Sequence, residues 1–137
     1  MKFELVNASR GDMIRVDIGG LFHYGIYVSD EEVIQFGYPP TLRDKDRDNI
    51  VVVVTSIDVF ACNNFVEVGV LDCKEKKKAF KVEEIISRAR SRIGEGGYNI
   101  LHNNCEHFAY ECYFGKKYSS QETLMREKWN ALRKVNK

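Results

Sequence analysis

The residue with the clearest chemical potential in this sequence is Cys105, which directly follows Asn104. Asparagine is a strong helix-capping residue, so a helix that begins here places the thiol in its first turn. In that turn, unpaired backbone N–H groups and the helix dipole favour negative charge. We therefore expect a stabilised Cys105 thiolate, which is a nucleophile toward carbonyl carbons.

A nucleophilic thiol needs a base, and the sequence offers three histidines: His23, His102 and His107. His107 follows Cys105 by two residues on the same predicted helix, and side chains at positions i and i+2 do not face each other. His102 lies in the connection before that helix, where no pattern defines its direction. His23 begins a predicted strand and is the preferred base, because a strand is a rigid frame.

A histidine base also needs a group that orients its ring, and the candidate is Gln35. His23 and Gly25 share one face of their strand. Gln35 shares that face only if the hairpin pairs residues whose numbers add up to an even value, as a loop of three or five residues would give. The Gln35 amide oxygen could then accept from one imidazole N–H across the space left by Gly25, while the other ring nitrogen faces Cys105.

The elements that must position these residues are strands first and helices later, which predicts an α+β fold. Alternating apolar residues and turn signals predict a three-stranded antiparallel meander and two later strands, the first of them β-branched enough to be central. The expected strands cover residues 13–18, 23–28, 33–36, 50–54 and 65–71. Apolar periodicity and capping residues predict one short and three longer helices. The expected helices cover residues 57–60, 82–93, 104–114 and 120–134.

Size and composition are those of one soluble globular domain. The chain has 137 residues, of which 44% are hydrophobic and 30% charged, and its net charge of +1 gives no nucleic-acid signature. No run approaches the roughly 18 apolar residues of a membrane span, and the first residues do not resemble a secretion signal. We therefore expect a cytoplasmic protein with reduced cysteines.

Three segments of the sequence resemble the lecithin:retinol acyltransferase family, whose members carry the NC domain. They are Phe22-His23-Tyr24-Gly25-Ile26-Tyr27-Val28, then Val33-Ile34-Gln35-Phe36, and then Asn103-Asn104-Cys105-Glu106-His107-Phe108. The lead-in Gly11-Asp12-Met13-Ile14 and the segment from Arg88 to Gly94 are also similar, so the resemblance covers roughly residues 8–120 in order.

The resemblance implies a circularly permuted papain-like fold of the NlpC type, in which an antiparallel sheet packs against helices. It implies that Cys105 is the nucleophile and His23 the base, and that Gln35 stands where the best-known animal members have a second histidine. Such a protein performs acyl transfer or hydrolysis on an ester or amide through a thioester acyl-enzyme. The acyl donor would be of the phospholipid type, and no metal or organic cofactor is needed.

Other interpretations use the same residues. His102, Cys105, His107 and Cys112 are four potential metal ligands within eleven residues, although their spacing matches no usual zinc pattern. A catalytically inactive domain that binds a partner or a membrane remains the main alternative, and an amidase or peptidase of the same superfamily is another. Free cysteines are usually inert core residues, and we assign that character to Cys62, Cys73 and Cys112.

The C-terminal segment is the basic part of the chain. From Lys116 to Lys137 there are seven Lys or Arg residues and two acidic ones. We expect residues 1–119 to form the acyltransferase-like domain and residues 120–137 a basic amphipathic helix. Its apolar stripe is Leu124, Met125, Trp129, Leu132 and Val135. The helix either docks on the domain or makes reversible peripheral contact with an anionic membrane.

Overall fold

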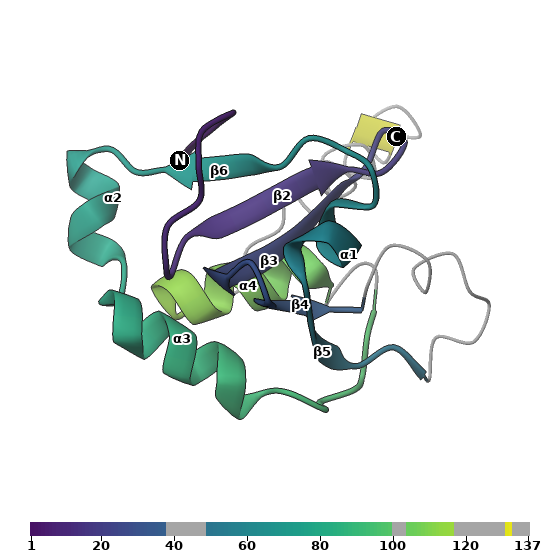
Figure 1. Ribbon diagram of the computed structural model, residues 1–137. Coiled ribbons are helices and arrows are strands. Elements are labelled where there is room, and N and C mark those ends of the chain that lie inside the picture. Colours follow the sequence, from purple (N-terminus) through teal and green to yellow (C-terminus); the bar gives the residue numbers. More distant parts are fainter. Residues whose placement is uncertain (38–48, 100–103, 117–130, 133–137) are drawn as a thin grey trace.

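A computed structural model describes residues 1–37, 49–99, 104–116 and 131–132 of the chain. Within these ranges an antiparallel sheet carries helices on both of its faces, which confirms the predicted α+β class. Figure 1 shows the short helix α1 in front of the sheet and the helix α4 behind it. The six strands lie side by side in the order β1-β6-β2-β3-β4-β5.

The elements follow the predicted order with small shifts at their ends. The strands are β1 (Lys2–Glu4), β2 (Met13–Asp17), β3 (Phe22–Ser29), β4 (Glu32–Phe36), β5 (Val52–Thr55) and β6 (Glu67–Val70). The helices are α1 (Ile57–Ala61), α2 (Cys73–Lys78), α3 (Val82–Ser91) and α4 (Cys105–Phe114). Neither β1 nor α2 was predicted. β1 has only three residues, and α2 buries none of its residues, so neither gives an apolar period.

Strand alternation divides the core into two layers. Behind the sheet, even-numbered residues of β3 and β4, such as Tyr24 and Phe36, pack against α3 and α4. In front of it, Ile14, Val16 and Val33 pack with Phe60 of α1. His23 lies opposite Val16 on β2, and Gln35 lies opposite Gly25 on β3, so both belong to the front layer.

The register that brings His23 and Gln35 to one face comes from a bulge and not from the loop length we expected. At the turn Ser29 pairs with Glu32, which leaves a two-residue loop and an odd pair sum. The register shifts between Tyr27 and Ser29, and from there Tyr27 pairs with Val33 and Gly25 with Gln35. A bulge adds one residue to one strand, so it converts the odd register into the even one.

The strand β5 corrects the prediction of a central strand, because it lies at the edge of the sheet beside β4. Its outer edge is covered by the chain that follows α3. Val52 N–H donates to the Glu95 carbonyl at 2.9 Å, and Gly94 N–H donates to the Val52 carbonyl at 2.8 Å. This backbone cover satisfies an edge that would otherwise be open to pairing, and Val52 is buried.

Two cysteines also depart from expectation, because Cys62 and Cys73 are exposed and not core residues. Cys112 is buried as predicted, and all four cysteines are free thiols. Of the helix expected at residues 120–134, only Ala131 and Leu132 are described, and both are helical and exposed. The rest of that prediction lies outside the described residues. Across the described residues, no helix combines the length and apolar content needed to cross a membrane.

Candidate functional site

The centre of the site is a hydrogen bond between His23 and Gln35. The His23 Nε2 and Gln35 Oε1 atoms are 2.6 Å apart, and both side chains are fully buried. An amide oxygen only accepts hydrogen bonds, so His23 carries its proton on Nε2. Its Nδ1 is buried and has no hydrogen-bond partner among the described residues. The hydrogen bond that the sequence predicted between His23 and Gln35 is therefore present.

The pair continues onto a third strand through Thr55. The Gln35 Nε2 atom donates to Thr55 Oγ1 at 2.6 Å, and Thr55 Oγ1 donates to the Ser56 carbonyl at 3.1 Å. His23, Gln35 and Thr55 come from the adjacent strands β3, β4 and β5, and they form a polar row across the front of the sheet. No pattern in the sequence indicated the Gln35–Thr55 contact, since this contact depends on the register of two strand pairs.

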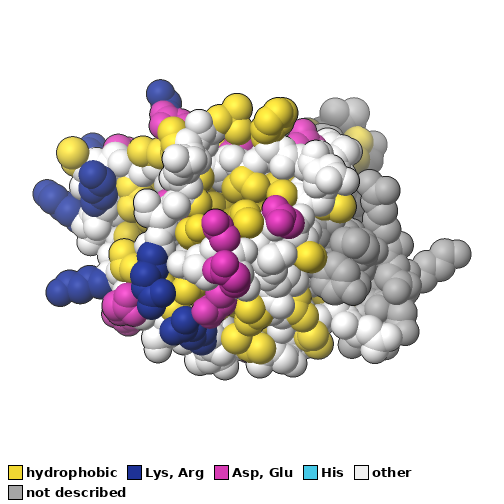
Figure 2. Space-filling model, viewed as in Figure 1, with side chains coloured by type: hydrophobic (Ala, Val, Ile, Leu, Met, Phe, Trp, Pro, Cys, Tyr) yellow, Lys and Arg dark blue, Asp and Glu magenta, His cyan; other side chains and the backbone are white. Residues whose placement is uncertain are grey.

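A phenylalanine of α1 covers this polar row. The Phe60 ring lies 5.3 Å from the His23 ring, centroid to centroid, with 33° between the planes. Gly25 makes the approach possible, because a Cβ there would lie 2.8 Å from Phe60 Cε2 and 3.2 Å from the Ile34 carbonyl oxygen. The space that we expected Gly25 to leave between His23 and Gln35 is thus filled by an aromatic ring, which keeps water from the buried pair. Figure 2 shows the same face of the molecule, and no described histidine side chain is visible on it.

Cys105 occupies the first helical position of α4, as the sequence predicted. Asn104 Oδ1 accepts from the His107 N–H at 3.0 Å, and His107 Nδ1 accepts from the Asn104 N–H at 3.1 Å. These reciprocal bonds form a capping box that fixes the start of the helix. They also give His107 a structural position, as its spacing from Cys105 indicated. A polar residue three positions after Asn104 is a capping signal that the sequence contains.

The Cys105 thiol reaches β3 where that strand separates from β4. The pairing of β3 with β4 ends at Gly25 and Gln35. Tyr27 N–H points toward β2, where it donates to the Asp12 carbonyl, so alternation directs the Tyr24 N–H toward β4. Beyond the last pair this N–H meets the Cys105 sulfur and favours its ionised form. The thiol therefore lies beside the peptide that joins His23 to Tyr24.

The protonation states of both groups are dominated by burial. Burial lowers the pKa of His23 to about 4, although Gln35 and the Gly37 backbone stabilise the charged ring. Burial likewise raises the pKa of the Cys105 thiol to about 11, although the backbone N–H groups of Tyr24, Glu106 and Cys105 itself favour the thiolate. The expectation of a stabilised resting thiolate is therefore wrong: desolvation outweighs the helix start. With these pKa values, the Cys105 thiol and the His23 ring are both neutral near pH 7.

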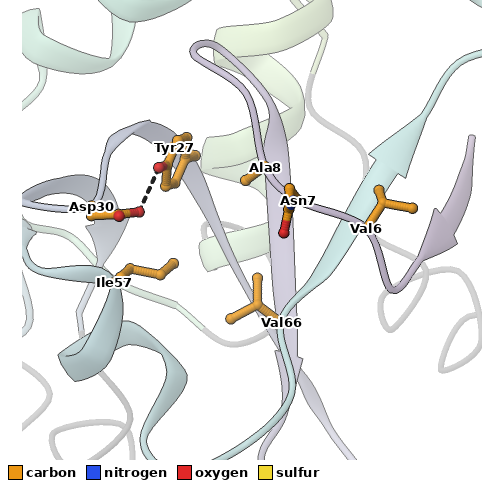
Figure 3. A pocket seen from close by; sticks show the side chains of 7 residues that line it. All are labelled: Val6, Asn7, Ala8, Tyr27, Asp30, Ile57 and Val66. Carbon is orange, nitrogen blue, oxygen red and sulfur yellow. Dashed lines mark hydrogen bonds between the residues drawn. The ribbon is translucent and has the colours of Figure 1, made fainter.

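A separate cavity of about 450 Å³ lies on the front of the sheet, toward the far end of β3 from His23. Its wall contains Tyr27, whose hydroxyl donates to Asp30 Oδ1 at 2.6 Å, as drawn in Figure 3. Tyr27 is half-buried at this pocket. The Ile57 N–H donates to the Asp30 carbonyl, which ties the start of α1 to the β3–β4 turn. The cavity is lined by Val6, Asn7, Ala8, Tyr27, Asp30, Ile57 and Val66.

The structure gives two of the four residues considered as metal ligands, His107 and Cys112, other surroundings. His107 closes the helix cap, and Cys112 lies buried two turns along α4 from Cys105. His102 lies outside the described residues. Among the residues that are described, no three His, Cys, Asp or Glu side chains gather in a way that could hold a metal ion.

The sequence of this chain is similar to those of several known proteins. The sequence model of the lecithin retinol acyltransferase family matches residues 6–118. Lecithin retinol acyltransferase from Mus musculus is 32% identical over 139 aligned residues, which cover 87% of this chain and 60% of that protein. The Bos taurus protein of the same name is 34% identical with the same coverage.

Another relative is the Homo sapiens protein named phospholipase A and acyltransferase 1. It is 30% identical over 129 residues, which cover 84% of this chain and 73% of that protein. This chain belongs to the lecithin retinol acyltransferase family. It spans about 60% of the length of the lecithin retinol acyltransferases that it matches.

Proposed function

We propose that this protein is a thiol acyltransferase or hydrolase that forms a thioester acyl-enzyme on Cys105, with His23 as its base and Gln35 as the group that orients His23. The observation that carries the proposal is the 2.6 Å bond between His23 and Gln35. It commits one ring nitrogen to Gln35 and leaves the other, Nδ1, with a free lone pair beside the strand that meets the thiol.

In the first half of the reaction, the Cys105 sulfur attacks the carbonyl carbon while His23 Nδ1 takes the thiol proton. Because both groups are neutral at rest, attack and proton transfer are coupled. The tetrahedral oxyanion accepts a hydrogen bond from the Cys105 backbone N–H at the helix start. When the intermediate collapses, the leaving alcohol or amine takes the proton from His23, and the acyl group remains on sulfur as a thioester.

In the second half, His23 accepts a proton from the acceptor as that acceptor attacks the thioester carbonyl. Collapse of the second tetrahedral intermediate returns the proton to the Cys105 sulfur. Water as the acceptor gives hydrolysis, whereas an alcohol or amine gives acyl transfer. No metal or organic cofactor takes part in this scheme.

The substrate class that we propose is a phospholipid-type ester. The names of the relatives support it, since lecithin is a phospholipid and phospholipase A cleaves phospholipid acyl esters. A peptide-type amide is the alternative substrate of the same chemistry. Gln35 is compatible with both, because an amide oxygen orients the histidine without adding charge.

The test is the intact mass of the protein after incubation with phosphatidylcholine micelles. Cys62 and Cys73 are exposed thiols, so the measurement uses a C62S/C73S variant to remove unrelated adducts. We expect a mass gain of one acyl chain, and its loss in Cys105→Ser and His23→Ala. Cys112→Ser is the matched control, because this thiol is buried seven residues after Cys105 on α4, and its loss should leave the adduct intact.

A result without any acyl adduct, together with no reaction of Cys105 with a thiol-directed probe, would identify a catalytically inactive binding domain. An adduct that forms from a peptide amide but not from phosphatidylcholine would identify an amidase. Either outcome overturns the phospholipid proposal.

We also propose the circularly permuted papain-like arrangement for the fold. The order of the elements supports it, since the strands with His23 and Gln35 precede the helix that begins with Cys105. An experimental structure should superpose on papain-like enzymes only when the chain order is permuted. Superposition in sequential order would contradict the proposal.

For the domain organisation of the chain, we propose a catalytic domain of residues 1–119 and a basic amphipathic helix of residues 120–137. The excess of Lys and Arg from Lys116 onward supports peripheral contact with anionic lipid, and the location that we propose is cytoplasmic. Sedimentation with phosphatidylserine vesicles should remove the full chain from solution at low salt. Binding that is insensitive to salt would contradict the electrostatic contact.

A further inference from the structure

In the polar row on the front of the sheet, the donor and the acceptor of each hydrogen bond can be assigned in turn, from Ser56 to His23. It begins at the Ser56 carbonyl, which can only accept hydrogen bonds. Thr55 Oγ1 lies 3.1 Å from this carbonyl and donates its single proton to it. The hydroxyl can then only accept from Gln35, whose Nε2 lies 2.6 Å away.

The same constraint passes on to His23. With its NH₂ group on Thr55, the Gln35 amide must turn its oxygen toward His23, where the separation from Nε2 is 2.6 Å. The imidazole proton is then on Nε2, and Nδ1 has the lone pair. If the amide were reversed, it would donate to the ring, and the proton would move to Nδ1. That tautomer has no lone pair on the atom that the proposed mechanism uses.

We propose that Thr55 is a positioning residue that fixes the orientation of the Gln35 amide and, through it, the Nε2-protonated tautomer of His23. The catalytic meaning of this inference rests on the proposed function, but the tautomer itself does not. The register supports the assignment, because Val53 lies opposite Gln35 and Thr55 is two residues further along β5, which is diagonal reach for a long side chain.

The end of the row is well anchored. The Ser56 carbonyl also accepts the Phe60 N–H at 3.1 Å as the first hydrogen bond of α1, and the Ser56 side chain accepts from the Val59 N–H. Phe60 in turn packs on the His23 ring. The helix α1 therefore holds the two ends of the row at once, the acceptor at Ser56 and the ring at His23.

The test measures the tautomer directly. In protein labelled with ¹⁵N-histidine, the protonated and unprotonated ring nitrogens have separate chemical shifts, and His23→Gln identifies the His23 signals. We expect a single Nε2-protonated form in the wild type and in Thr55→Ser, which keeps the hydroxyl. In Thr55→Val, which keeps the β-branched shape, we expect a mixture of both tautomers and slower acyl-enzyme formation by about tenfold, the size of one neutral hydrogen bond.

A second variant separates positioning from packing. Gln35→Glu replaces the amide, which has one donor and one acceptor group, with a carboxylate whose two oxygens only accept. The orientation of the carboxylate therefore does not affect its hydrogen bonding, and Thr55 can donate to it. Thr55→Val should therefore leave the His23 tautomer unchanged in the Gln35→Glu background. A purely structural contribution of Thr55 would lower the rate equally in both backgrounds.

The outcomes distinguish this inference from the proposed function. A tautomer that responds to Thr55→Val only when Gln35 is present supports the inference even if no acyl-enzyme forms. A single unchanged tautomer in Thr55→Val, or an equal change in the Gln35→Glu background, overturns it even if the protein is a competent acyltransferase.

Discussion

The two buried histidines among the described residues, His107 and His23, differ in the hydrogen bonding of their Nδ1 atoms. His107 bonds to the backbone of a residue three positions away, and its Nδ1 is an acceptor within a helix cap. His23 bonds to a side chain twelve residues away on another strand, and its Nδ1 has no partner among the described residues. A histidine whose accepting nitrogen is already occupied stabilises local structure, whereas one whose accepting nitrogen is free can take a proton.

The largest expected difference between the two histidines is in the rate of acyl-enzyme formation. His23→Gln should lower this rate by about 10²–10⁴-fold, the usual contribution of a general base. His107→Gln is the matched control, because glutamine at the third helical position can complete the same capping box. Intact mass spectrometry of samples quenched after increasing reaction times measures the rates for both variants. Equal losses in both would remove the distinction between a base and a cap.

The second difference concerns stability at acid pH. The pKa of His23 is about 4 in the folded state and 6.5 in its ordinary state, so the unfolded chain binds the proton more tightly. Stability is thus full above pH 6.5 and falls as the pH drops toward 4, by up to about 3 kcal/mol. Urea unfolding of the wild type and His23→Gln across this range should converge or cross. A constant difference between them would show that His23 is not buried in its neutral form.

The third prediction concerns the ring that covers His23. Gly25→Ala places a methyl group against Phe60 and the Ile34 carbonyl, and such overpacking should destabilise the fold by about 1–3 kcal/mol. Adding Phe60→Leu should recover part of this loss, because a smaller side chain leaves room for the new methyl group. Chemical denaturation of the single and double variants checks this. Additive losses would mean that Phe60 does not occupy the space above Gly25.

The smallest effect is expected at the helix cap. Asn104→Ala removes the acceptor for the His107 N–H and should cost about 1 kcal/mol of unfolding free energy. Asn104→Asp keeps an acceptor oxygen and should be close to the wild type. The His23 tautomer should not change in either variant, since no hydrogen bond given for the described residues joins the cap bonds between Asn104 and His107 to the polar row. A shift of the His23 ring signals in Asn104→Ala would instead couple the two regions.

Much of the helix side of the site could be predicted because the controlling interactions are local. Asn104 before Cys105 and Gly115 after Phe114 define both ends of α4 within the sequence itself. For the strands, the sequence predicted only the pairing register that would bring His23 and Gln35 to one face of the sheet. The pairing parity needed for His23 and Gln35 was stated correctly, but a bulge near Ser29 supplies it, and no residue pattern indicated that bulge.

The sequence by itself determined which residues are candidates for the chemistry and where the helices and most strands begin, since capping, turns and apolar periods act over a few residues. Only the tertiary structure decided three other things: the polar row through Thr55, the neutral resting state of Cys105 and His23, and the position of β5 at the edge. Each depends on burial or on contacts between strands distant along the chain. Such contacts reflect how the layers pack, and no local pattern of side chains records that packing.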